Sequence, residues 1–137
     1  MNCKICELKN QKIPFLIFES EFFRIRHSEL EKNSPGYLYL EPKKHIENFT
    51  EFTTNEYIDY AKCLQIGMNW IEKNLKPKKI YLVTISEAVP HIHFHLVPRF
   101  TNEEKGFIFL EKSVTSKSNI NSYNIEALNI IKNIFKV

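Results

Sequence analysis

The sequence predicts an α+β fold in which a mainly antiparallel sheet carries one long inserted helix and a C-terminal helix. Three observations lead to this prediction. Short runs of β-prone residues are joined by tight turns, which is typical of neighbouring antiparallel strands. One stretch in the middle of the chain has helical periodicity, and so does the C-terminal end. The 137 residues, 43% apolar and 26% charged, suit a single globular domain spanning 1–137.

The N-terminal half contains three predicted strands. The segments 13–20 (IPFLIFES) and 22–27 (FFRIRH) are rich in aromatic and β-branched residues, and apolar and charged residues alternate in the second. The turn sequence KNSPG, residues 32–36, precedes a third strand at 37–42 (YLYLEP). Because the connections are short, we expect these strands to lie side by side in one sheet.

The strongest helix signal covers residues 53–77. Thr53 is followed three residues later by Glu56, which is the pattern of a capping box, and Pro77 ends the segment. Apolar residues recur at helical spacing between these ends, and this periodicity predicts the buried stripe of the helix: Ile58, Ala61, Leu64, Met68, Ile71 and Leu75.

Further strands follow this helix. We expect them at 80–85 (IYLVTI), at 89–100 (VPHIHFHLVPRF) and, from a weaker pattern, at 106–110 (GFIFL). The polar stretch 112–122 then separates the main body from a C-terminal helical extension at 121–137. The apolar stripe of that last helix is predicted to consist of Ile125, Leu128, Ile131 and Phe135.

Composition narrows the classes of partner. The formal charge of +3 is too small to indicate nucleic-acid binding, although it is compatible with an anionic small molecule. No apolar run reaches the length of a membrane span, and the residues after Met1 do not resemble a signal peptide. We therefore expect a cytoplasmic protein with neither a membrane nor a nucleic-acid partner. Its three cysteines, an odd number, argue against a disulfide framework.

Three of the five histidines lie at every second position of one predicted strand: His91, His93 and His95. In a strand this spacing places the three imidazoles on one face and the apolar spacers on the other. Such a row could bind a catalytic zinc ion. It could also supply a nucleophile, because a neutral imidazole can attack phosphorus while its neighbours stabilise the phosphoryl oxygens. A third interpretation is that the strand carries the histidines by chance. In that case each buried imidazole would still need a hydrogen-bond partner.

The histidine run resembles the signature of the histidine triad (HIT) family. Residues 91–97 (HIHFHLV) match the pattern His-φ-His-φ-His-φ-φ, where φ is apolar. The likeness extends upstream to 3–23 (CKICELKNQKIPFLIFESEFF) and to 34–53 (SPGYLYLEPKKHIENFTEFT), in the order that the family has. The resemblance thus covers residues 3 to about 100 and implies an α+β fold of the HIT type.

The resemblance implies a hydrolase that acts on the α-phosphate of a purine nucleotide, either a nucleoside phosphoramidate or a dinucleoside polyphosphate. His93 would attack phosphorus and form a nucleotidyl-histidine, and His95 would contact the phosphoryl oxygens or help the leaving group. The alternative of the same fold is a non-catalytic nucleotide-binding or interaction module. A three-histidine zinc hydrolase or lyase is the third class.

The resemblance also implies substrate contacts, and here the chain departs from the family. The acidic residue that holds the ribose falls on Glu29, or on His27 if the second strand fixes the alignment. Ser86 and Glu87 stand where the phosphate-lining segment is expected, but the stretch 83–91 contains no glycine. Glu87 replaces a glutamine, and its carboxylate would repel a phosphate unless it points away.

The cysteines and two histidines suggest a structural metal. Cys3 and Cys6 have the Cys-x-x-Cys spacing of a zinc-binding pair, but two thiolates leave a tetrahedral zinc with two ligands missing. The resemblance implies that His45 and His91 complete the set, as in bacterial-type members. If no zinc binds, the cysteines stay reduced and His45 is a hydrogen-bond donor in the active site. The family resemblance further implies a homodimer.

Overall fold

One antiparallel sheet forms the centre of the protein. The computed structural model describes residues 2–101, 104–119 and 122–137. The sheet has the strand order β1-β2-β3-β5-β4, and each neighbouring pair is antiparallel. The strands are β1 (Leu16–Glu19), β2 (Phe23–His27), β3 (Leu38–Pro42), β4 (Lys79–Val83) and β5 (Phe94–Arg99). The predicted α+β class with a mainly antiparallel sheet is therefore confirmed.

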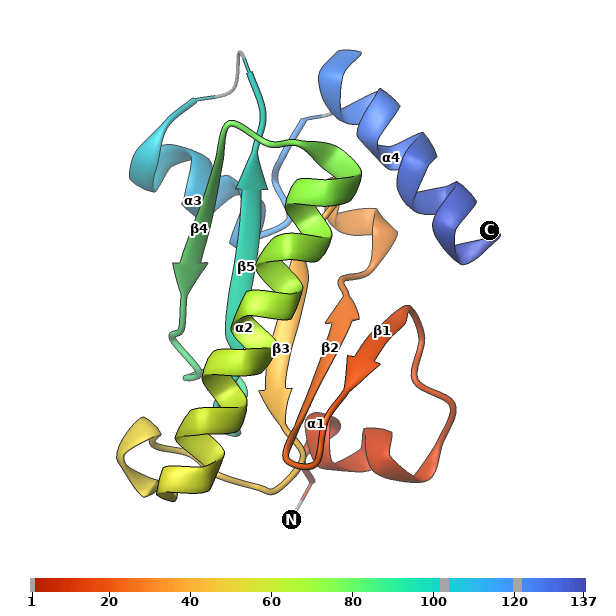
Figure 1. Ribbon diagram of the computed structural model, residues 1–137. Helices are drawn as coiled ribbons and strands as arrows, with labels where there is room; N and C mark the ends of the chain where they lie inside the picture. Colours follow the sequence, from red (N-terminus) through yellow and green to blue (C-terminus); the bar gives the residue numbers. More distant parts are fainter. Residues whose placement is uncertain (1, 102–103, 120–121) are drawn as a thin grey trace.

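Helices cover both faces of the sheet (Figure 1). The long helix α2 crosses one face and α4 packs beside it, whereas α3 lies on the opposite face. The α-helices are α1 (Lys4–Glu7), α2 (Thr54–Leu75), α3 (Gly106–Val114) and α4 (Ser122–Phe135), with short 3₁₀ turns at Leu8–Asn10, Leu30–Lys32 and Phe49–Glu51. Within the described ranges, no helix is both long enough and apolar enough to cross a membrane.

The capping box at the start of α2 is confirmed. The backbone N–H of Glu56 donates to the Thr53 hydroxyl at 3.1 Å, and the Thr53 N–H donates back to the Glu56 carboxylate at 3.0 Å. These two bonds satisfy N–H groups that a helix start otherwise leaves free. The helix then runs without interruption to Leu75, close to the predicted end at Pro77.

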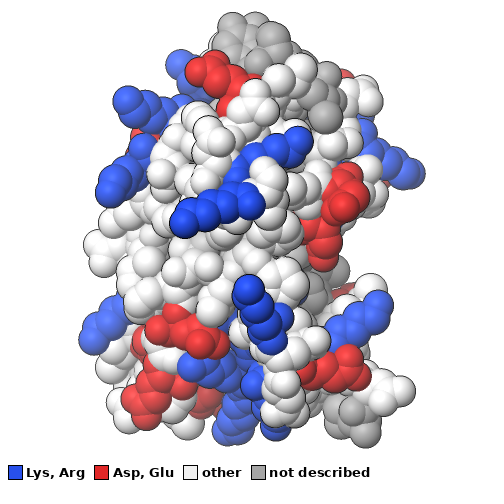
Figure 2. All heavy atoms as spheres, turned by 90° about the vertical axis from the view of Figure 1, so that its right-hand side faces the viewer, with Lys and Arg blue, Asp and Glu red and all other residues white. Residues whose placement is uncertain are grey.

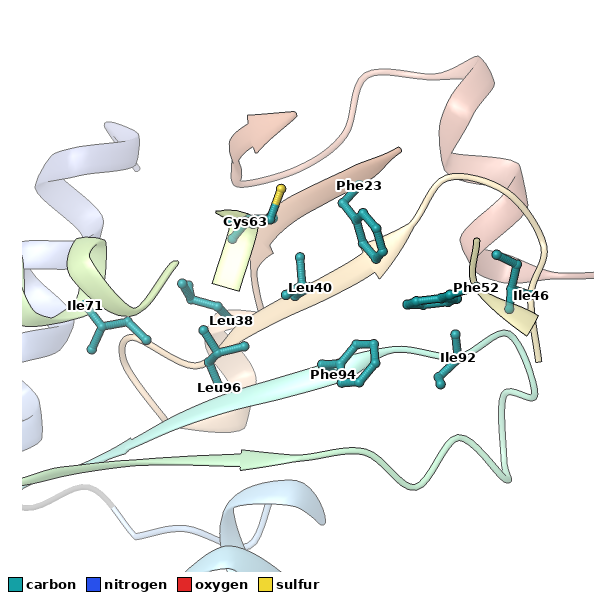
Figure 3. Close-up of a cluster of buried hydrophobic side chains, with 11 residues drawn as sticks. Phe23, Leu38, Leu40, Ile46, Phe52, Cys63, Ile71, Ile92, Phe94 and Leu96 are labelled. Carbon is teal, nitrogen blue, oxygen red and sulfur yellow. The ribbon is translucent and has the colours of Figure 1, made fainter. Parts of the chain in front are cut away.

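The main core lies between α2 and the sheet (Figure 3). Its buried members come from β2, β3, β5 and α2 and from the segments beside them: Phe23, Ile25, Leu38, Leu40, Ile46, Phe52, Cys63, Ile71, Ile92, Phe94 and Leu96. Because side chains alternate along a strand, the residues between these core positions point to the other face of the sheet. This other face, which we call the site face, carries Arg24, Arg26, Tyr39, Glu41, His93 and His95.

The predicted stripe of α2 is only partly right. Ile58 is 50% exposed and Ala61 is also exposed, whereas the fully buried positions are Glu56, Cys63, Gly67 and Ile71. Close approach to the sheet explains the shift, because a Cβ at Gly67 would lie only 3.0 Å from the Leu96 side chain. The helix therefore approaches the strands most closely at Gly67.

The prediction of a strand at 106–110 is wrong, because this segment forms the first half of α3. Phe109 packs against Tyr37, Tyr39 and Val97 on the site face, so helical geometry gives this segment its one buried aromatic. A five-residue apolar run cannot distinguish a strand from a helix by its own periodicity.

The predicted C-terminal helix is present as α4. Its stripe is partly wrong, because Ile125 is 48% exposed while Ala127 and Ile131 are buried. Phe135 packs edge-on against Phe15, with ring centroids 5.2 Å apart, and also contacts Trp70 of α2. The end of α4 is thereby fixed against both α2 and the segment that leads into β1.

Candidate functional site

The structure divides the three histidines of residues 91–95. The strand β5 begins only at Phe94, so His91 and His93 lie in the bend that leads into it. His93 and His95 are neighbours on the site face, with ring centroids 4.9 Å apart. His91 is fully buried and its ring turns toward Cys3 and Cys6. The expected row of three equivalent imidazoles is therefore a pair plus a separate buried ring.

The hydrogen bonds of His93 leave one ring nitrogen free. Nδ1 lies 2.9 Å from the backbone oxygen of His91, an acceptor, so Nδ1 carries the proton. No hydrogen bond is made by Nε2 within the described residues, and in this tautomer it holds a lone pair. Ser86 fixes the backbone here, because its hydroxyl accepts the His93 N–H at 3.0 Å. The ring is partly exposed and can be reached by a substrate.

His95 has the opposite arrangement. Its Nδ1 lies 2.6 Å from the hydroxyl of Tyr37. Burial lowers the pKa of His95 to about 3, assisted by the charges of His93 and Lys32, and burial raises the pKa of Tyr37 well above its usual range. At neutral pH the tyrosine is therefore protonated and donates to Nδ1. The remaining proton of His95 lies on Nε2, which can donate to an anion.

The loop before the triad is held by hydroxyl groups instead of glycines. The Thr84 hydroxyl donates to the His93 carbonyl at 2.8 Å and lies 3.2 Å from the Ser86 hydroxyl. Ser86 has a left-handed backbone, with φ of 53°, although it is not glycine. Glu87 is exposed, and the described part of the chain shows no hydrogen bond from it to the triad. Ser86 thus lies beside His93, whereas Glu87 does not contact the histidines.

Glu29 lies close to the triad through Tyr39. The Tyr39 hydroxyl donates to the Glu29 carboxylate at 3.2 Å, and the Tyr39 ring lies edge-on to His95 with centroids 5.5 Å apart. The guanidinium of Arg26 sits 4.5 Å from the centre of the same ring. His27, the alternative ribose contact, is the last residue of β2, and its ring bonds Ser28 O and Gly36 N–H. Both of its nitrogens are therefore occupied by backbone groups.

A cluster of four possible metal ligands lies at the N-terminus. The ligand atoms of Cys3, Cys6, His45 and His91 all lie within 4.8 Å of one another. Nδ1 of His91 is 3.4 Å from each of the two sulfurs, and Nδ1 of His45 is 3.5 Å from the sulfur of Cys6. Helix α1 brings the cysteines together, because Cys3 is its N-cap and Cys6 lies in its only turn.

These separations fit a tetrahedral zinc site. A zinc ion bound at about 2.3 Å to sulfur and about 2.0 Å to nitrogen holds neighbouring S and N ligands about 3.5 Å apart. The donor set, two thiolates and two imidazoles, is also one that zinc prefers over calcium or magnesium. The cluster therefore could hold a metal ion, and zinc suits both its chemistry and its spacing.

The second ring nitrogens of the two metal-site histidines support this geometry. Nε2 of His91 donates to the Pro42 carbonyl at 2.8 Å, which leaves Nδ1 unprotonated and directed at the sulfurs. Nε2 of His45 lies 3.0 Å from the Glu47 carboxylate. Burial lowers the pKa of His91, so its ring is neutral, as a metal ligand must be. Outer partners of this kind orient histidine ligands in metal sites.

Sequence reasoning missed Tyr37 as a site residue. The alternation of YLYLEP contains the signal, because Leu38 and Leu40 face the core and place Tyr37, Tyr39 and Glu41 on the site face. The sequence does not show which of these side chains meets His95. That depends on the register of β3 with β5, in which Tyr39 lies opposite His95.

Comparisons with known proteins agree with this geometry. The family model of the HIT domain matches residues 13–102. Among curated proteins, the chain is 26% identical over 108 residues to the bis(5′-adenosyl)-triphosphatase of Saccharomyces cerevisiae. That alignment covers 72% of this chain but 52% of the yeast protein, so the chain spans about half the length of that relative.

Solved structures show the same fold. A hypothetical histidine triad nucleotide-binding protein from Sulfolobus tokodaii superposes with a TM-score of 0.66 at 22% identity, covering 98% of this chain and 92% of that one. A zinc-bound histidine triad family protein from Mycobacterium smegmatis has the same TM-score at 17% identity, covering 98% and 93%. The arrangement of strands and helices is thus one that other proteins with a histidine triad share.

Proposed function

Because this chain belongs to the HIT domain family, we propose that it is a nucleotide hydrolase that cleaves at the α-phosphate of nucleoside phosphoramidates or dinucleoside polyphosphates. The observation that carries the proposal is the state of His93. Its Nδ1 proton is fixed on the His91 carbonyl, so Nε2 keeps a lone pair on the exposed side of the site face. A nitrogen in this state can attack an electrophilic phosphorus.

The proposed reaction has two steps. In the first, Nε2 of His93 forms a bond to the α-phosphorus, the bond from phosphorus to the leaving group breaks, and the leaving group takes a proton from solvent. In the second, water attacks the same phosphorus, the N–P bond breaks, and a nucleoside monophosphate leaves with the imidazole restored. The attacking water of the second step returns a proton to solvent. The Nε2–H of His95 donates to a phosphoryl oxygen as negative charge develops there.

Substrate recognition is proposed to use the groups around this pair. Glu29 is positioned by Tyr39 and would accept hydrogen bonds from the ribose hydroxyls. Ser86 lies at the His93 backbone and would contact the phosphate from the loop side. Glu87 is also proposed to line this pocket, and its side chain is exposed. Its carboxylate would have to point away from the phosphate to avoid repulsion.

A structural zinc ion is proposed at Cys3, Cys6, His45 and His91. Bound zinc would join the N-terminal turn to β3 and to the bend before β5, and it would supply folding energy there. The His91 side chain would then be a metal ligand, and its backbone carbonyl would position the ring of His93. The chemistry at phosphorus would belong to His93 and His95 alone.

We also propose that the protein forms a homodimer. The strand β4 is the last strand of the sheet, so one of its edges has backbone groups that are free to pair. Leu82 on this strand is 43% exposed, and Ile85 just after it is 60% exposed. A second copy that packs on this edge would bury both side chains in a two-fold interface.

The decisive test is turnover of defined substrates. Purified protein should release AMP from an adenosine phosphoramidate or from a diadenosine polyphosphate at neutral pH. Equilibrium binding of AMP is measured in parallel. If AMP binds but neither substrate is turned over, the protein is a non-catalytic nucleotide-binding module and not a hydrolase. A protein that binds no nucleotide cannot be the proposed hydrolase, because both substrates contain a nucleotide.

A further inference from the structure

Arg24 is a buried cation without a partner. It lies on β2, is 1% exposed, and its Nε and Nη1 atoms are buried with no hydrogen-bond partner among the described residues. Burial of a guanidinium is costly unless an acceptor or a counter-charge compensates it. Buried polar groups in folded proteins are nearly always hydrogen-bonded, so this side chain points to something that binds it.

The neighbouring carboxylates do not neutralise Arg24. Its cross-strand partners are Glu19 on β1 and Glu41 on β3. Glu41 is committed to another cation, because its carboxylate bonds Nε of Arg26 at 2.7 Å. Glu19 is exposed, and within the described ranges it forms no ion pair with Arg24.

Arg24 lines a cavity of about 810 Å³ at the β1 edge of the sheet. Three lysines line it as well, Lys9, Lys12 and Lys43, and Glu19 is the single acidic residue in its wall. Apolar side chains from the approach to β1 and from the end of α4 form the rest. The face of the molecule seen from this side carries basic side chains at several places, with acidic side chains among them (Figure 2). The volume is in the range of small-molecule sites.

The cavity is distinct from the histidine site. Its wall does not contain His93, His95 or any other residue proposed above to contact the substrate. In the strand order, β3 separates β2 from β5, so Arg24 lies two strands from His93, roughly 10 Å across the sheet. An anion held by Arg24 therefore occupies a different place from the phosphorus that His93 attacks.

We propose that this cavity is a second, anion-binding site for a phosphate group, with Arg24 as its buried anchor. Arg24 lies in the wall of the cavity and supplies a buried positive charge, and the three lysines supply the remaining positive potential. Hydrogen bonds between charged partners are about twice as strong as neutral ones, and arginine is suited to phosphate. The proposal rests on this geometry and does not depend on the hydrolase assignment.

The test is a titration of the full chain with inorganic phosphate, pyrophosphate and AMP in a phosphate-free buffer of low ionic strength. Calorimetry gives the dissociation constants, and ¹⁵N NMR follows the Arg24 Nε–H signal. We expect saturable binding of one anion that shifts this signal. Arg24→Leu should weaken binding by about tenfold or more, which is the loss expected for a charged hydrogen bond. Glu19→Gln should tighten it by removing one negative charge from the cavity wall.

Two controls separate this site from others. Lys62→Ala removes one positive charge from α2, away from the cavity, and should leave the affinity unchanged. His93→Ala should also bind the anion normally, since the histidine site is elsewhere. If Arg24→Leu fails to fold, the double variant Lys9→Ala/Lys12→Ala must still weaken binding while Glu19→Gln tightens it.

The outcomes decide the proposal in either direction. Binding of phosphate or pyrophosphate assigns the site to a free anion, whereas binding of AMP alone, still dependent on Arg24, assigns it to the phosphate of a nucleotide. The proposal is overturned if none of the three ligands binds at millimolar concentration. It is equally overturned if the binding of phosphate and pyrophosphate survives Arg24→Leu or is lost in His93→Ala.

Discussion

The Tyr37 hydroxyl donates a hydrogen bond of 2.6 Å to Nδ1 of His95, and both side chains are buried. This bond places the remaining imidazole proton on Nε2. The ammonium of Lys32 lies 4.8 Å from the centre of the Tyr37 ring and also donates to the backbone carbonyl of Val114. The tyrosine is therefore fixed from both sides, and it controls which nitrogen of His95 can act as a donor.

Removal of this hydroxyl is the first prediction. Tyr37→Phe should lower kcat by about 10- to 100-fold and change KM less, because His95 loses the partner that fixes its tautomer. The unpaired buried Nδ1 should also lower the free energy of unfolding by about 1–3 kcal/mol. Steady-state kinetics with a nucleoside phosphoramidate and urea unfolding measure the two effects.

Tyr57→Phe is the matched control for Tyr37→Phe. It removes a hydroxyl that bonds the Phe49 carbonyl near the surface, remote from the triad, and should leave kcat unchanged. A Tyr37→Phe enzyme with normal kcat would show that the tyrosine only packs against His95 and does not orient it.

Most of the fold could be predicted from local sequence. The capping residues Thr53 and Glu56 locate the start of α2 correctly, and runs of β-prone residues bounded by turns, two of them with period-two alternation, locate all five strands of the sheet. The apolar run at 106–110 was assigned wrongly, because contact of Phe109 with Tyr37 and Tyr39 decides its conformation and no local pattern records that contact. The stripe of α2 shifted for a similar reason, since the close approach at Gly67 depends on the partner strand.

The site residues also fall into two groups, those that local sequence patterns indicate and those that only the folded structure brings together. The spacing of Cys3 and Cys6 and the period of the histidine run are local patterns, so the sequence indicates these groups. Their joining to His45 came only from family resemblance, because the four ligands meet through the folded sheet. Tyr37 and Arg24 could not be identified from sequence spacing. The role of each depends on the side chains that neighbouring strands place beside it, and strand pairing decides which side chains these are.

The second prediction concerns acid stability. Desolvation by burial lowers the pKa of His27 to about 4, from an ordinary value of 6.5. The neutral ring accepts the Gly36 N–H at 2.8 Å. The unfolded chain therefore takes up a proton below pH 6.5 that the folded chain refuses until about pH 4. The free energy of unfolding should fall as pH drops through this window, by at most about 1.4 kcal/mol per pH unit for this group. His95 adds a similar loss that extends to about pH 3.

The variant His27→Gln isolates this contribution, because its amide can still accept the Gly36 N–H but does not titrate. Urea unfolding at several pH values between 7 and 4.5 should show a flatter pH dependence than the wild type. The metal cluster is common to both proteins, so its own acid sensitivity cancels in the difference. Parallel curves for the two proteins would assign the acid loss to other groups.

The third prediction is that the β4 edge forms the dimer. Light scattering at micromolar concentration should give about twice the chain mass of 16.3 kDa. Leu82→Lys places a charge on the exposed edge and should shift the mass toward the monomer without loss of helix content. Ile108→Lys, on the exposed side of α3, makes the same chemical change outside the interface and should leave the mass unchanged. A wild type that elutes with the mass of one chain contradicts the dimer.

The last prediction is that His91 and His93 have separate tasks. Replacing His93 by alanine removes the nucleophile and should lower turnover by several orders of magnitude. Zinc content and melting temperature should change little, because the His93 ring is partly exposed and is not a member of the ligand cluster. Replacing His91 by alanine should instead release zinc and lower the melting temperature, since a structural metal site contributes directly to folding. Metal analysis, thermal unfolding and single-turnover kinetics on both variants provide the measurements.

Cys6→Ser gives an independent check on this division. It leaves both histidines in place but weakens the metal site, so it should resemble the His91 variant in stability while keeping more activity than the His93 variant at low temperature. Two results would contradict the division of tasks. If the His93 variant loses its zinc, the three histidines share one metal ion, and a chelator should then abolish turnover at once. If the His93 variant keeps full activity, another group attacks phosphorus, because without the His93 ring the attack assigned to Nε2 cannot occur.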